Sequence, residues 1–569
     1  MVYRNHWRDI FDGNVPEGWQ PTMKVSVVIA SYNSATVHLT LASLAAQDYP
    51  EDLLEVICVD DGSEDPVVPG EFVPKNLTVI RVGEGEGWGR SNAMDIAIKR
   101  STGDIIYWVD SDMVLFSDNV RQHAKWGHFI PEAATIGHKG FVEEWDFTPE
   151  QVFNDVKSGK IREYRNLDDL HRHWSIDIYD KTDDLNESDG RNYSTHMGAC
   201  ASVTRLVYER TNGQDTRLHL GEDTEIAYQL WQAGAVFIPV HEAPGWHLGR
   251  ATVQDHAAAV SHVNDVHFAQ RMPIPRYRRT PKRLFWEVPW ATVVVPVTLE
   301  TANFARACVD RILSCSEADL RVVLVGPWST LDEGRRKMMA DPRNELFLTH
   351  EWYRADCRVV FAEEPPETVF PSPYRVDVPV TAGFSPDGLK RLLYKIDGEH
   401  LGRVHCFTPG HDRDQSVTAT ATVAYERARS YVSSSVSLEE AIDAGWGVEW
   451  ATFPAEQLYD LREVDLSEKV SGVDPEIGRW KQRAERAEKQ LAKGSDSGRE
   501  LVLWKQKAEQ AESEVTKLKK RVRVLKGQLA ATQEEPSLYI RTRRQAGRVA
   551  RKLGWRGRSN AETRRSGQG

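Results

Sequence analysis

The sequence predicts an α/β protein with a mostly parallel sheet domain, a second α/β domain and a C-terminal coiled coil. Three observations indicate this fold class. Runs of β-branched residues alternate with helical stretches from Val25 onward, as in βαβ units. A similar pair of strands recurs from Thr292, and apolar residues step by three and four after Ile477. The 569 residues are enough for three or four domains of ~150 residues each, and a composition of 40% hydrophobic and 27% charged residues is typical of a folded chain.

The first domain is expected at residues 23–260, after an N-terminal extension at residues 1–22. Its strands are short runs of Val, Ile and Leu, and an apolar stripe at helical spacing follows the first of them. The strands expected here are residues 25–30, 54–59, 77–82, 105–109, 197–203 and 236–240. Gly234 ends the helix that precedes the last strand, as a C-terminal cap.

Polar or glycine-rich clusters follow the first four strands. They are Ser31-Tyr32-Asn33, Asp60-Asp61-Gly62-Ser63, the loop from Gly83 to Gly89, and Asp110-Ser111-Asp112. In open parallel sheets the ligand binds outside the carboxyl ends of the strands. We therefore expect one crevice to gather all four clusters.

The acidic triplet is the strongest of these signals. Asp110 and Asp112 at the tip of a buried strand offer hard oxygen ligands, which suit Mg²⁺ or Mn²⁺ held together with a diphosphate. An acidic triplet in isolation is more often a solvated turn. Asp60 and Asp61 could accept hydrogen bonds from a base or a ribose, and the alternative is an Asx-turn after the strand.

Two later residues complete the candidate site. Asp223 stands at the start of a helix, where it could cap the helix and could also act as an ionised general base toward the crevice, since the two roles are compatible. His247 lies between Gly245 and Gly249, and it is either a loop or core histidine or a third metal ligand.

Taken together, these residues resemble the inverting family-2 glycosyltransferases of GT-A fold, a Rossmann-like mixed sheet. The resemblance covers roughly residues 23–255. It depends on the motifs Ser31-Tyr32-Asn33, Asp60-Asp61-Gly62-Ser63, Arg90-Ser91-Asn92, Asp110-Ser111-Asp112 (the D-x-D motif) and Gly221-Glu222-Asp223, followed by His247. The sequence departs from the family at Ala30, where members often have Thr.

The resemblance implies a role for each residue. The set that it assigns to the nucleotide sugar is Tyr32, Asp61, Arg90, Asp110 and Glu222, with Tyr32 and Asp61 at the base. Asp112 and His247 would hold Mn²⁺ or Mg²⁺, and Asp223 would be the catalytic base.

The implied reaction is a single displacement with inversion. A hydroxyl of a glycan or lipid-linked acceptor attacks the anomeric carbon of a nucleotide-diphosphate sugar, most plausibly in the synthesis of a cell-surface glycan or glycolipid. Among the 18 tryptophans we expect Trp145 and Trp174 to be acceptor contacts, since both lie in the irregular segment beside the crevice.

The second α/β domain is expected at residues 286–462, after a linker at residues 261–285. It resembles the first domain in a degenerate form, because Gly326-Pro327-Trp328-Ser329 replaces the first acidic cluster. We match the strand at 402–407 to the strand before the acidic triplet, and Asp412 and Asp414 follow it. Two alignments place either Ser434 or Glu440 opposite Asp223.

The C-terminal region is expected to be a coiled coil at residues 474–534 and a basic amphipathic tail at residues 536–569. The coiled coil would be either an intramolecular hairpin or a continuous helix with a shifted register, and it could form a homo-oligomer contact. The tail has ten Lys or Arg residues against Glu562 alone, within a chain of net charge -12. It either lies on an anionic membrane surface or is a solvated tail.

The remaining features limit the cellular context. The chain has no apolar run of 18 residues and no signal core, and its six cysteines form no C-x-x-C pair. We expect a cytoplasmic protein, peripheral at the inner face of the cell membrane if the tail binds lipid, with reduced thiols and no nucleic-acid partner.

Two other functions compete with the transferase. One is a non-catalytic carbohydrate- or nucleotide-binding scaffold that the coiled coil assembles. The other is a nucleotidyltransferase, which would need a glycine-rich basic signature near the first strand, and this signature is absent from the sequence.

Overall fold

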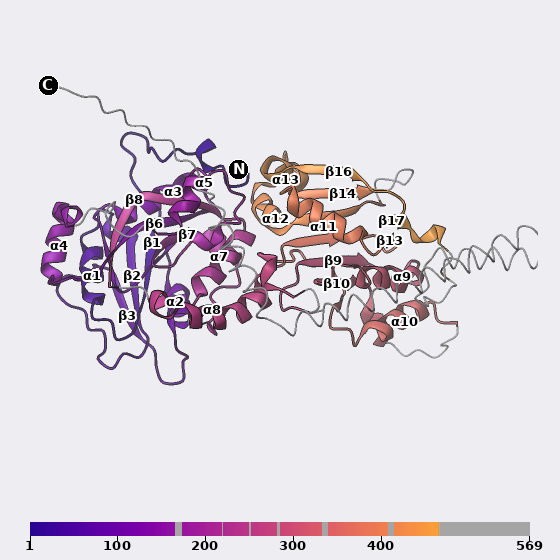
Figure 1. Cartoon of the computed structure of the whole chain (residues 1–569), viewed down its shortest axis with the longest axis horizontal. Helices are drawn as coiled ribbons and strands as arrows, with labels where there is room; N and C mark the ends of the chain where they lie inside the picture. The colour runs from indigo at the N-terminus through magenta and orange to yellow at the C-terminus, as the bar shows by residue number, and fades with distance from the viewer. Residues whose placement is uncertain are drawn as a thin grey trace, which may run out of the picture. The chain divides into compact units, whose positions relative to one another are not determined.

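A computed structural model gives the fold of this protein (Figure 1). The structure describes residues 1–164, 173–218, 220–249, 252–280, 285–332, 340–407, 415–464 and 466. Residues Met1–Asp465 form one compact unit. The predicted coiled coil and basic tail lie outside the described residues.

The first sheet has eight strands in the order β3-β2-β1-β4-β7-β6-β8-β5. The strands are β1 (Val25–Ser31), β2 (Leu54–Asp60), β3 (Leu77–Arg81), β4 (Ile105–Val109), β5 (Met113–Leu115), β6 (Ala133–Val142), β7 (Cys200–Thr204) and β8 (Val236–Leu248). The first four strands are parallel, β7 is antiparallel to both of its neighbours, and β6 and β8 are parallel to each other. The sheet is therefore mixed, as expected for the fold class.

Helices cover this sheet on both faces (Figure 1). They are α1 (Val37–Ala45), α2 (Arg90–Arg100), α3 (Asn119–Phe129), α4 (Pro149–Ser158), α5 (Ile176–Lys181), α6 (Arg205–Tyr208), α7 (Glu222–Gln232) and α8 (Thr252–Arg271). Because both faces are covered, the central strands are near-continuous apolar runs, and Val27, Ile29 and Val56 are completely buried. Helix α8 runs across the predicted domain boundary at residue 260.

The N-terminal extension packs on the first sheet. The rings of Trp7 and Phe11 make edge contacts with Trp126 at centroid distances of 5.1 and 5.0 Å. The buried amide of Asn5 donates to the carbonyl of Phe237 and accepts from its N–H, both at 2.8 Å, so that Asn5 extends the edge of β8.

The second sheet repeats the first. Its strand order, β11-β10-β9-β12-β15-β14-β16, matches β3-β2-β1-β4-β7-β6-β8 place by place, with the same parallel and antiparallel pairs. The strands are β9 (Ala291–Pro296), β10 (Leu320–Val325), β11 (Val359–Ala362), β12 (Tyr374–Asp377), β13 (Ala382–Phe384), β14 (Arg403–Phe407), β15 (Val417–Ala421), β16 (Val448–Thr452) and β17 (Leu458–Asp460), and β13 pairs with β17 apart from this sheet. Its helices are α9 (Ala302–Leu313), α10 (Asn344–Tyr353), α11 (Gly388–Gly398), α12 (Thr422–Ala428) and α13 (Leu438–Trp446).

The strand registers align the two sheets residue by residue. Leu54 pairs with Val25 in the first sheet, and Leu320 pairs with Ala291 in the second. Both pairs are 29 residues apart in sequence, so Pro327 takes the place of Asp61. The second sheet is thus the predicted internal repeat.

The strand match that we expected for the acidic triplet is wrong. β14 (Arg403–Phe407) occupies the place of β6, and the strand in the place of β4 is β12. Tyr374 of β12 pairs with Ala291 as Ile105 pairs with Val25, which puts Pro379 and Thr381 where the first sheet has Asp110 and Asp112. The expectation failed because both strands are short apolar runs, and only the hydrogen-bonded neighbours distinguish them. Asp412 and Asp414 lie outside the described residues.

Helix α13 corresponds to α7, since each precedes the last parallel strand of its sheet. Asp223 is the second residue of α7, and Glu439 is the second residue of α13. Counting from the helix start therefore places Glu439 opposite Asp223, one residue before Glu440. The Glu440 carboxylate accepts hydrogen bonds from the Ser437 N–H and hydroxyl, at 2.8 and 2.7 Å, and closes a capping box.

Two arginines join the sheet regions within Met1–Asp465. Both end a Tyr-Glu-Arg sequence, at Arg210 after α6 and at Arg427 in α12. Buried Arg427 donates to the carbonyls of Gly234, Ala235 and Val2 at 2.7, 2.8 and 3.1 Å. These bonds satisfy carbonyls at the end of α7 and in the N-terminal segment, which would otherwise be buried without a donor.

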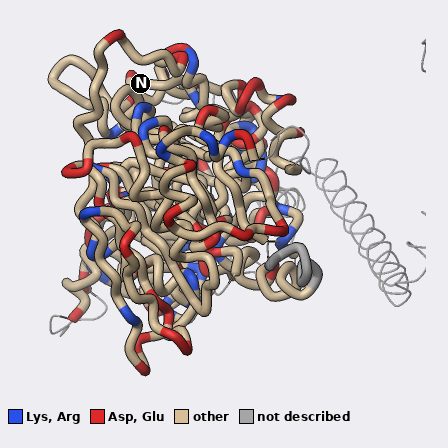
Figure 2. The backbone as a smooth tube through the Cα atoms, turned by 90° about the vertical axis from the view of Figure 1, so that its left-hand side faces the viewer, with Lys and Arg blue, Asp and Glu red and all other residues tan. Residues whose placement is uncertain are grey.

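Charged residues of both signs are interspersed on the face that Figure 2 shows. Such a mixture differs from the basic stripe that is typical of nucleic-acid-binding domains. Among the described residues, we find no helix with the length and apolar character needed to span a bilayer.

Candidate active site

The acidic triplet and His247 meet at one edge of the first sheet. Asp110 and Asp112 follow β4, and the short strand β5 after them pairs antiparallel with β8, with Met113 opposite His247. This pairing places the imidazole Nε2 of His247 at 3.5 Å from the Asp112 Oδ1. Ligand atoms of Asp110, Asp112 and His247 all lie within 4.8 Å of one another, a spacing at which one cation could contact all three.

The electrostatics of the three residues fit a divalent cation. Burial, together with the neighbouring Asp110, raises the pKa of Asp112 to about 7. Burial lowers the pKa of His247 to about 4, so its imidazole is neutral at neutral pH and free to act as a ligand. Asp112 Oδ1 is buried and has no hydrogen-bond partner among the described residues. A hard cation would supply the missing partner and favour the ionised carboxylate.

Arg90 links the triplet to helix α7. Its guanidinium donates to the Asp110 Oδ1 from Nε at 3.0 Å and from Nη2 at 2.7 Å, and Nη1 donates to the Glu222 Oε1. Burial opposes the charge of Arg90, but the carboxylates of Asp110 and Glu222 raise its pKa well above the usual value. The same guanidinium lowers the pKa of Asp110 against the effect of burial. Asp110 is thus held as an anion by a fixed counter-charge.

Asp223 lies one residue after Glu222 in the first turn of α7, and it is partly exposed. Gly221 is the N-cap, with φ of +85°, and an added Cβ there would overlap Asn264 of α8. The expectation that Asp223 caps the helix is therefore wrong. Its Oδ1 instead accepts the N–H of Thr224 at 2.7 Å, and Arg90, Glu222 and Asp223 line a common hollow.

The nucleotide side of the predicted site lies at the ends of β1 and β2. The Asp61 carboxylate is buried and accepts the N–H of Gly89 at 2.7 Å, which ties the glycine-rich loop to the end of β2. Tyr32 is 51% exposed and makes an edge contact with Trp88 of that loop, at a centroid distance of 5.7 Å. Sequence reasoning missed Trp88, although a tryptophan among four glycines is a recognisable signal.

Asp60 and Asp61 differ in their surroundings. Asp60 accepts the N–H groups of Ser63 and Val67, at 2.8 and 3.2 Å, and pairs with Arg81. These bonds are those of a turn after a strand, which is the alternative that we gave for the pair. Asp60 is therefore a turn residue, whereas Asp61 lies beside the loop before α2.

The two predicted acceptor tryptophans also differ. Trp145 is partly buried and packs on Phe147 and Tyr164, at centroid distances of 4.7 and 5.9 Å, as part of the core below α4. Trp174 is 49% exposed and lies against His173, with centroids 5.3 Å apart. Trp174 is the more exposed of the two and is therefore better placed to contact a sugar.

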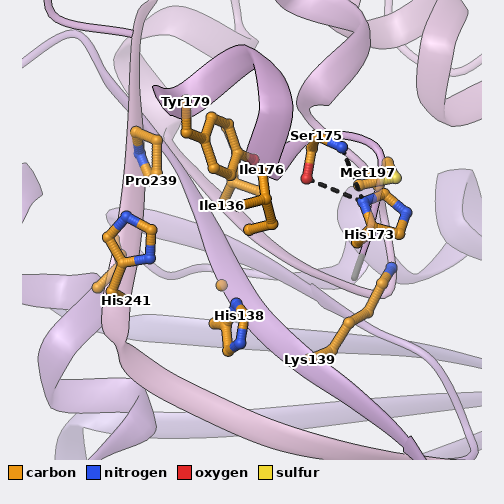
Figure 3. A pocket seen from close by; sticks show the side chains of 12 residues that line it. Ile136, His138, Lys139, His173, Ser175, Ile176, Tyr179, Met197, Pro239 and His241 are labelled. Atoms are coloured by element: carbon orange, nitrogen blue, oxygen red, sulfur yellow. Dashed lines mark hydrogen bonds between the residues drawn. The ribbon is translucent and has the colours of Figure 1, made fainter. Parts of the chain in front are cut away.

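A second hollow is lined by residues of β6, β8, α5 and the segment before α5 (Figure 3). Sequence reasoning missed its lining residues His138, Lys139 and His241, because they depend on how β6 pairs with β8. The charge of Lys139 adds to that of Arg90 in lowering the pKa of Asp110, and it partly offsets the rise that burial gives the pKa of Asp112.

The sequence-predicted residues thus form a connected set. Asp110, Asp112 and His247 lie together as a possible cation site. Arg90 donates hydrogen bonds to both Asp110 and Glu222, and Glu222 is next to Asp223 in the chain. Gly89, which precedes Arg90, donates its N–H to Asp61. Tyr32 lies at the outer edge, against Trp88.

Comparison with known proteins gives a family for this region. Residues 26–181 match the family described as Glycosyl transferase family 2. The chain is 23% identical over 333 residues to the hyaluronan synthase of Pasteurella multocida, which covers 54% of this chain and 33% of that protein. It is also 23% identical over 333 residues to the chondroitin synthase of Escherichia coli, and this match covers 54% of this chain and 47% of that protein. The chain thus spans between a third and a half of the length of these curated relatives.

Among solved structures, the chain resembles S. aureus TarS residues 1–349 in complex with UDP-GlcNAc. The TM-score is 0.31, the sequence identity is 18%, and the match covers 45% of this chain and 69% of that one.

Proposed function

We propose that the chain, whose residues 26–181 match the family described as Glycosyl transferase family 2, transfers a sugar from a nucleotide-diphosphate sugar to a hydroxyl acceptor with inversion. The observation that carries this proposal is the convergence of Asp110, Asp112 and His247 beside the Arg90–Glu222 pair. Relatives with a similar chain are named as hyaluronan and chondroitin synthases, which supports a glycan as the product.

The donor would occupy the edge from Tyr32 to the acidic triplet. Tyr32 offers an exposed ring for stacking with the base, and Trp88 stands edge-on beside it. Asp61 fixes the glycine-rich loop through the Gly89 N–H, and so positions the backbone that would border the nucleotide.

Asp110, Asp112 and His247 would hold Mn²⁺ or Mg²⁺ next to the donor diphosphate. When bound, the cation would neutralise the negative charge of the departing nucleotide diphosphate. Arg90 contributes by keeping Asp110 ionised and aligned.

Asp223 would remove the proton from the attacking hydroxyl. It stands in the first turn of α7, and its Oδ1 is oriented by the Thr224 N–H. Attack from the Asp223 side, with the diphosphate held on the cation side, accounts for inversion at the anomeric carbon.

The second sheet would serve as a non-catalytic partner of the first. Pro327, Pro379 and Thr381 stand where the first sheet has Asp61, Asp110 and Asp112. With these residues it offers no carboxylate for a cation at those places.

Two further parts of the proposal depend on sequence alone. The tail at residues 536–569 would bring the enzyme to an anionic membrane surface and a lipid-linked acceptor, and residues 474–534 would form an oligomer contact. Sedimentation with vesicles of 30% anionic lipid tests the tail, since a chain that ends at residue 535 should stay in solution while the full chain sediments.

The experiment that tests the proposed function is a donor assay. Release of nucleotide diphosphate is measured from UDP-, GDP- and TDP-sugars, with Mn²⁺ or Mg²⁺, for the wild type and for Asp112→Asn. The proposal expects metal-dependent release from one nucleotide class in the wild type and its loss in the variant. Release that is equal in both proteins, or absent from the wild type with every donor, would contradict it.

A further inference from the structure

Three buried polar side chains adjoin the hollow of Asp223. Besides Asp223 and Arg90, this hollow is lined by Trp108, Gln214 and Glu222. The exposed fractions of these three residues are 2%, 9% and 4%, so each is more than nine-tenths buried. Each also has one buried polar atom without a hydrogen-bond partner among the described residues, namely the indole Nε1, the amide Oε1 and the carboxylate Oε2. Buried polar atoms of this kind are rare, because each costs free energy until a partner satisfies it.

Three separate elements bring these residues together. Trp108 belongs to β4, two residues before the acidic triplet, and Glu222 is the first residue of α7. Gln214 lies in the segment between α6 and α7. The Ser91 hydroxyl of α2 fixes this segment by donating to the carbonyl of Asp215 at 2.8 Å. The hollow is therefore enclosed by parts of the chain that hydrogen bonds hold in place.

The chemistry of the three atoms indicates which molecule could satisfy them. The indole N–H can only donate a hydrogen bond, whereas the amide oxygen and the ionised carboxylate oxygen can only accept one. A water molecule can donate to both oxygens and accept from the indole. A metal cation could not accept from the N–H, and an anion would face two acceptors. The hollow has room for a molecule about the size of water.

Glu222 connects this hollow to the candidate cation site. Its Oε1 accepts a hydrogen bond from Arg90, and Arg90 donates to the Asp110 Oδ1 from Nε and Nη2. Burial raises the pKa of Glu222 despite the charge of Arg90. A hydrogen bond to the second carboxylate oxygen, Oε2, would favour the ionised form and so strengthen the hold of Glu222 on the guanidinium.

We propose that this hollow holds one ordered water molecule, which accepts the N–H of Trp108 and donates to Gln214 Oε1 and Glu222 Oε2. Trp108 and Gln214 are then positioning residues. Through the water they keep Glu222 ionised, and Glu222 in turn keeps Arg90 aligned on Asp110. The inference rests on the proposed function, since Asp110 belongs to the proposed donor site, and it adds two residues to that site.

A crystal structure of the full chain, grown without a donor at high resolution, tests the water directly. We expect one water peak at about 3 Å from each of the three polar atoms, the usual length of such hydrogen bonds. A hollow without a water at these atoms overturns the inference. This measurement does not depend on whether the chain transfers a sugar.

Variants test the positioning role by separating KM from kcat. Trp108→Phe removes the N–H and keeps an aromatic ring, and Gln214→Met removes the amide at a similar size. Each should raise the donor KM by ~5- to 10-fold and change kcat by less than ~2-fold, because Arg90 and Asp110 hold the donor in the ground state and the transition state alike. Circular dichroism verifies the fold of each variant, and either variant alone is sufficient for the test.

Two matched controls remove similar groups elsewhere in the first sheet region. Trp126→Phe removes a buried indole N–H, and Gln232→Met removes a buried amide at the end of α7. Both groups are also without a hydrogen-bond partner among the described residues, and neither residue lines the hollow. Both controls should leave the donor KM unchanged, whatever their effect on stability.

The outcomes separate this inference from the proposed function. A hollow without the bridging water, or equal KM values in the hollow variants and their controls, overturns the inference, and donor release by the wild type would then leave the transferase intact. A bridging water in a protein that releases no nucleotide from any donor contradicts the positioning role together with the proposed function. A bridging water, donor release and a raised KM confined to the two hollow variants support both.

Discussion

The two sheets of this chain have the same strand order, the same strand directions and the same 29-residue spacing between the first strand pair, yet only one has the acidic residues. The first sheet places Asp110 and Asp112 after β4, and the second places Pro379 and Thr381 at the matching positions. The sheet itself therefore does not need these carboxylates. Clustered acids are costly to bury, and the first sheet retains them together with a partly buried counter-charge, Arg90.

The helices α7 and α13, which precede the last parallel strand of each sheet, show the same difference. In α7 the carboxylate of Glu222 binds Arg90 and that of Asp223 faces a hollow. In α13 Glu440 caps its own helix, and Glu439 pairs with Arg403 and His405, each at 3.3 Å. The same turn of the same fold thus serves a site in one copy and local stability in the other.

The largest expected effect concerns the proposed base, Asp223, and its counterpart in the second sheet, Glu439. Asp223→Asn should lower sugar transfer by ~100-fold or more, the usual scale for a positioned general base. Its counterpart in the second sheet, Glu439→Gln, should leave transfer unchanged. Steady-state transfer assays compare the two. An equal rate in wild type and Asp223→Asn removes Asp223 from the role, and a large loss in Glu439→Gln would make the second sheet part of the site.

The next effect concerns the contact between the two regions. Arg427→Met removes the donor that three buried carbonyls share, at Gly234, Ala235 and Val2. We expect the free energy of unfolding to fall by about 3 kcal/mol, because buried acceptors lose a charged partner. Denaturant unfolding measures this value. Tyr431→Phe removes one hydrogen bond to Glu132 in the same region and should cost about 1 kcal/mol. If Arg427→Met and Tyr431→Phe lower the free energy of unfolding by the same small amount, Arg427 does not stabilise the contact between the two sheet regions.

The third prediction concerns the pH dependence of cation binding. The pKa of Asp112 is about 7, so a proton competes with the cation below that pH, whereas His247, with a pKa of about 4, does not. Mn²⁺ affinity should therefore rise by ~10-fold from pH 6 to pH 8 and then level off. Titration followed by electron paramagnetic resonance measures it. An affinity that is flat over this range contradicts the assignment of Asp112.

The same raised pKa affects the stability of the fold in the opposite direction, because the free energy of unfolding falls as the pH rises. Without a cation, folded Asp112 binds its proton more tightly than the unfolded carboxyl does. Its contribution to the free energy of unfolding is complete at low pH and is lost as the pH rises from about 4 to about 7.

The smallest expected effect concerns a feature that the two regions share. Helix α4 in the first sheet region and α13 in the second each begin with a capping box, Thr148 with Gln151 and Ser437 with Glu440. Thr148→Ala and Ser437→Ala should each lower the free energy of unfolding by about 1 kcal/mol and leave transfer unchanged. A loss of transfer in only one of them would show that its helix supports the site.

Much of the fold could be predicted from local patterns. The strands of the first sheet are buried apolar runs, and the acidic clusters mark their ends, so Asp61, Asp110 and Asp112 were found from the sequence. Asp223 and His247 were candidates from their places at a helix start and between glycines, and Arg90 and Glu222 came from the resemblance of short motifs. Their convergence near the triplet follows from the sheet.

The features that were missed depend on contacts between distant residues. The hollow between β6 and β8 requires the register shift between these strands, and no local pattern marks where a pairing slips. Likewise, β12 and β14 are both short apolar strands, and only their neighbours show which one corresponds to β4. Arg427 is charged and buried, and its four partners lie about 190 to 425 residues away in sequence.

The most direct test of the central claim is the anomalous scattering of Mn²⁺ in crystals of the full chain grown with a nucleotide diphosphate. The account predicts one strong peak between Asp110, Asp112 and His247, and none beside Pro379 and Thr381 of the second sheet. A Mn²⁺ peak elsewhere, with Asp112 and His247 uninvolved while the nucleotide is bound, would contradict it.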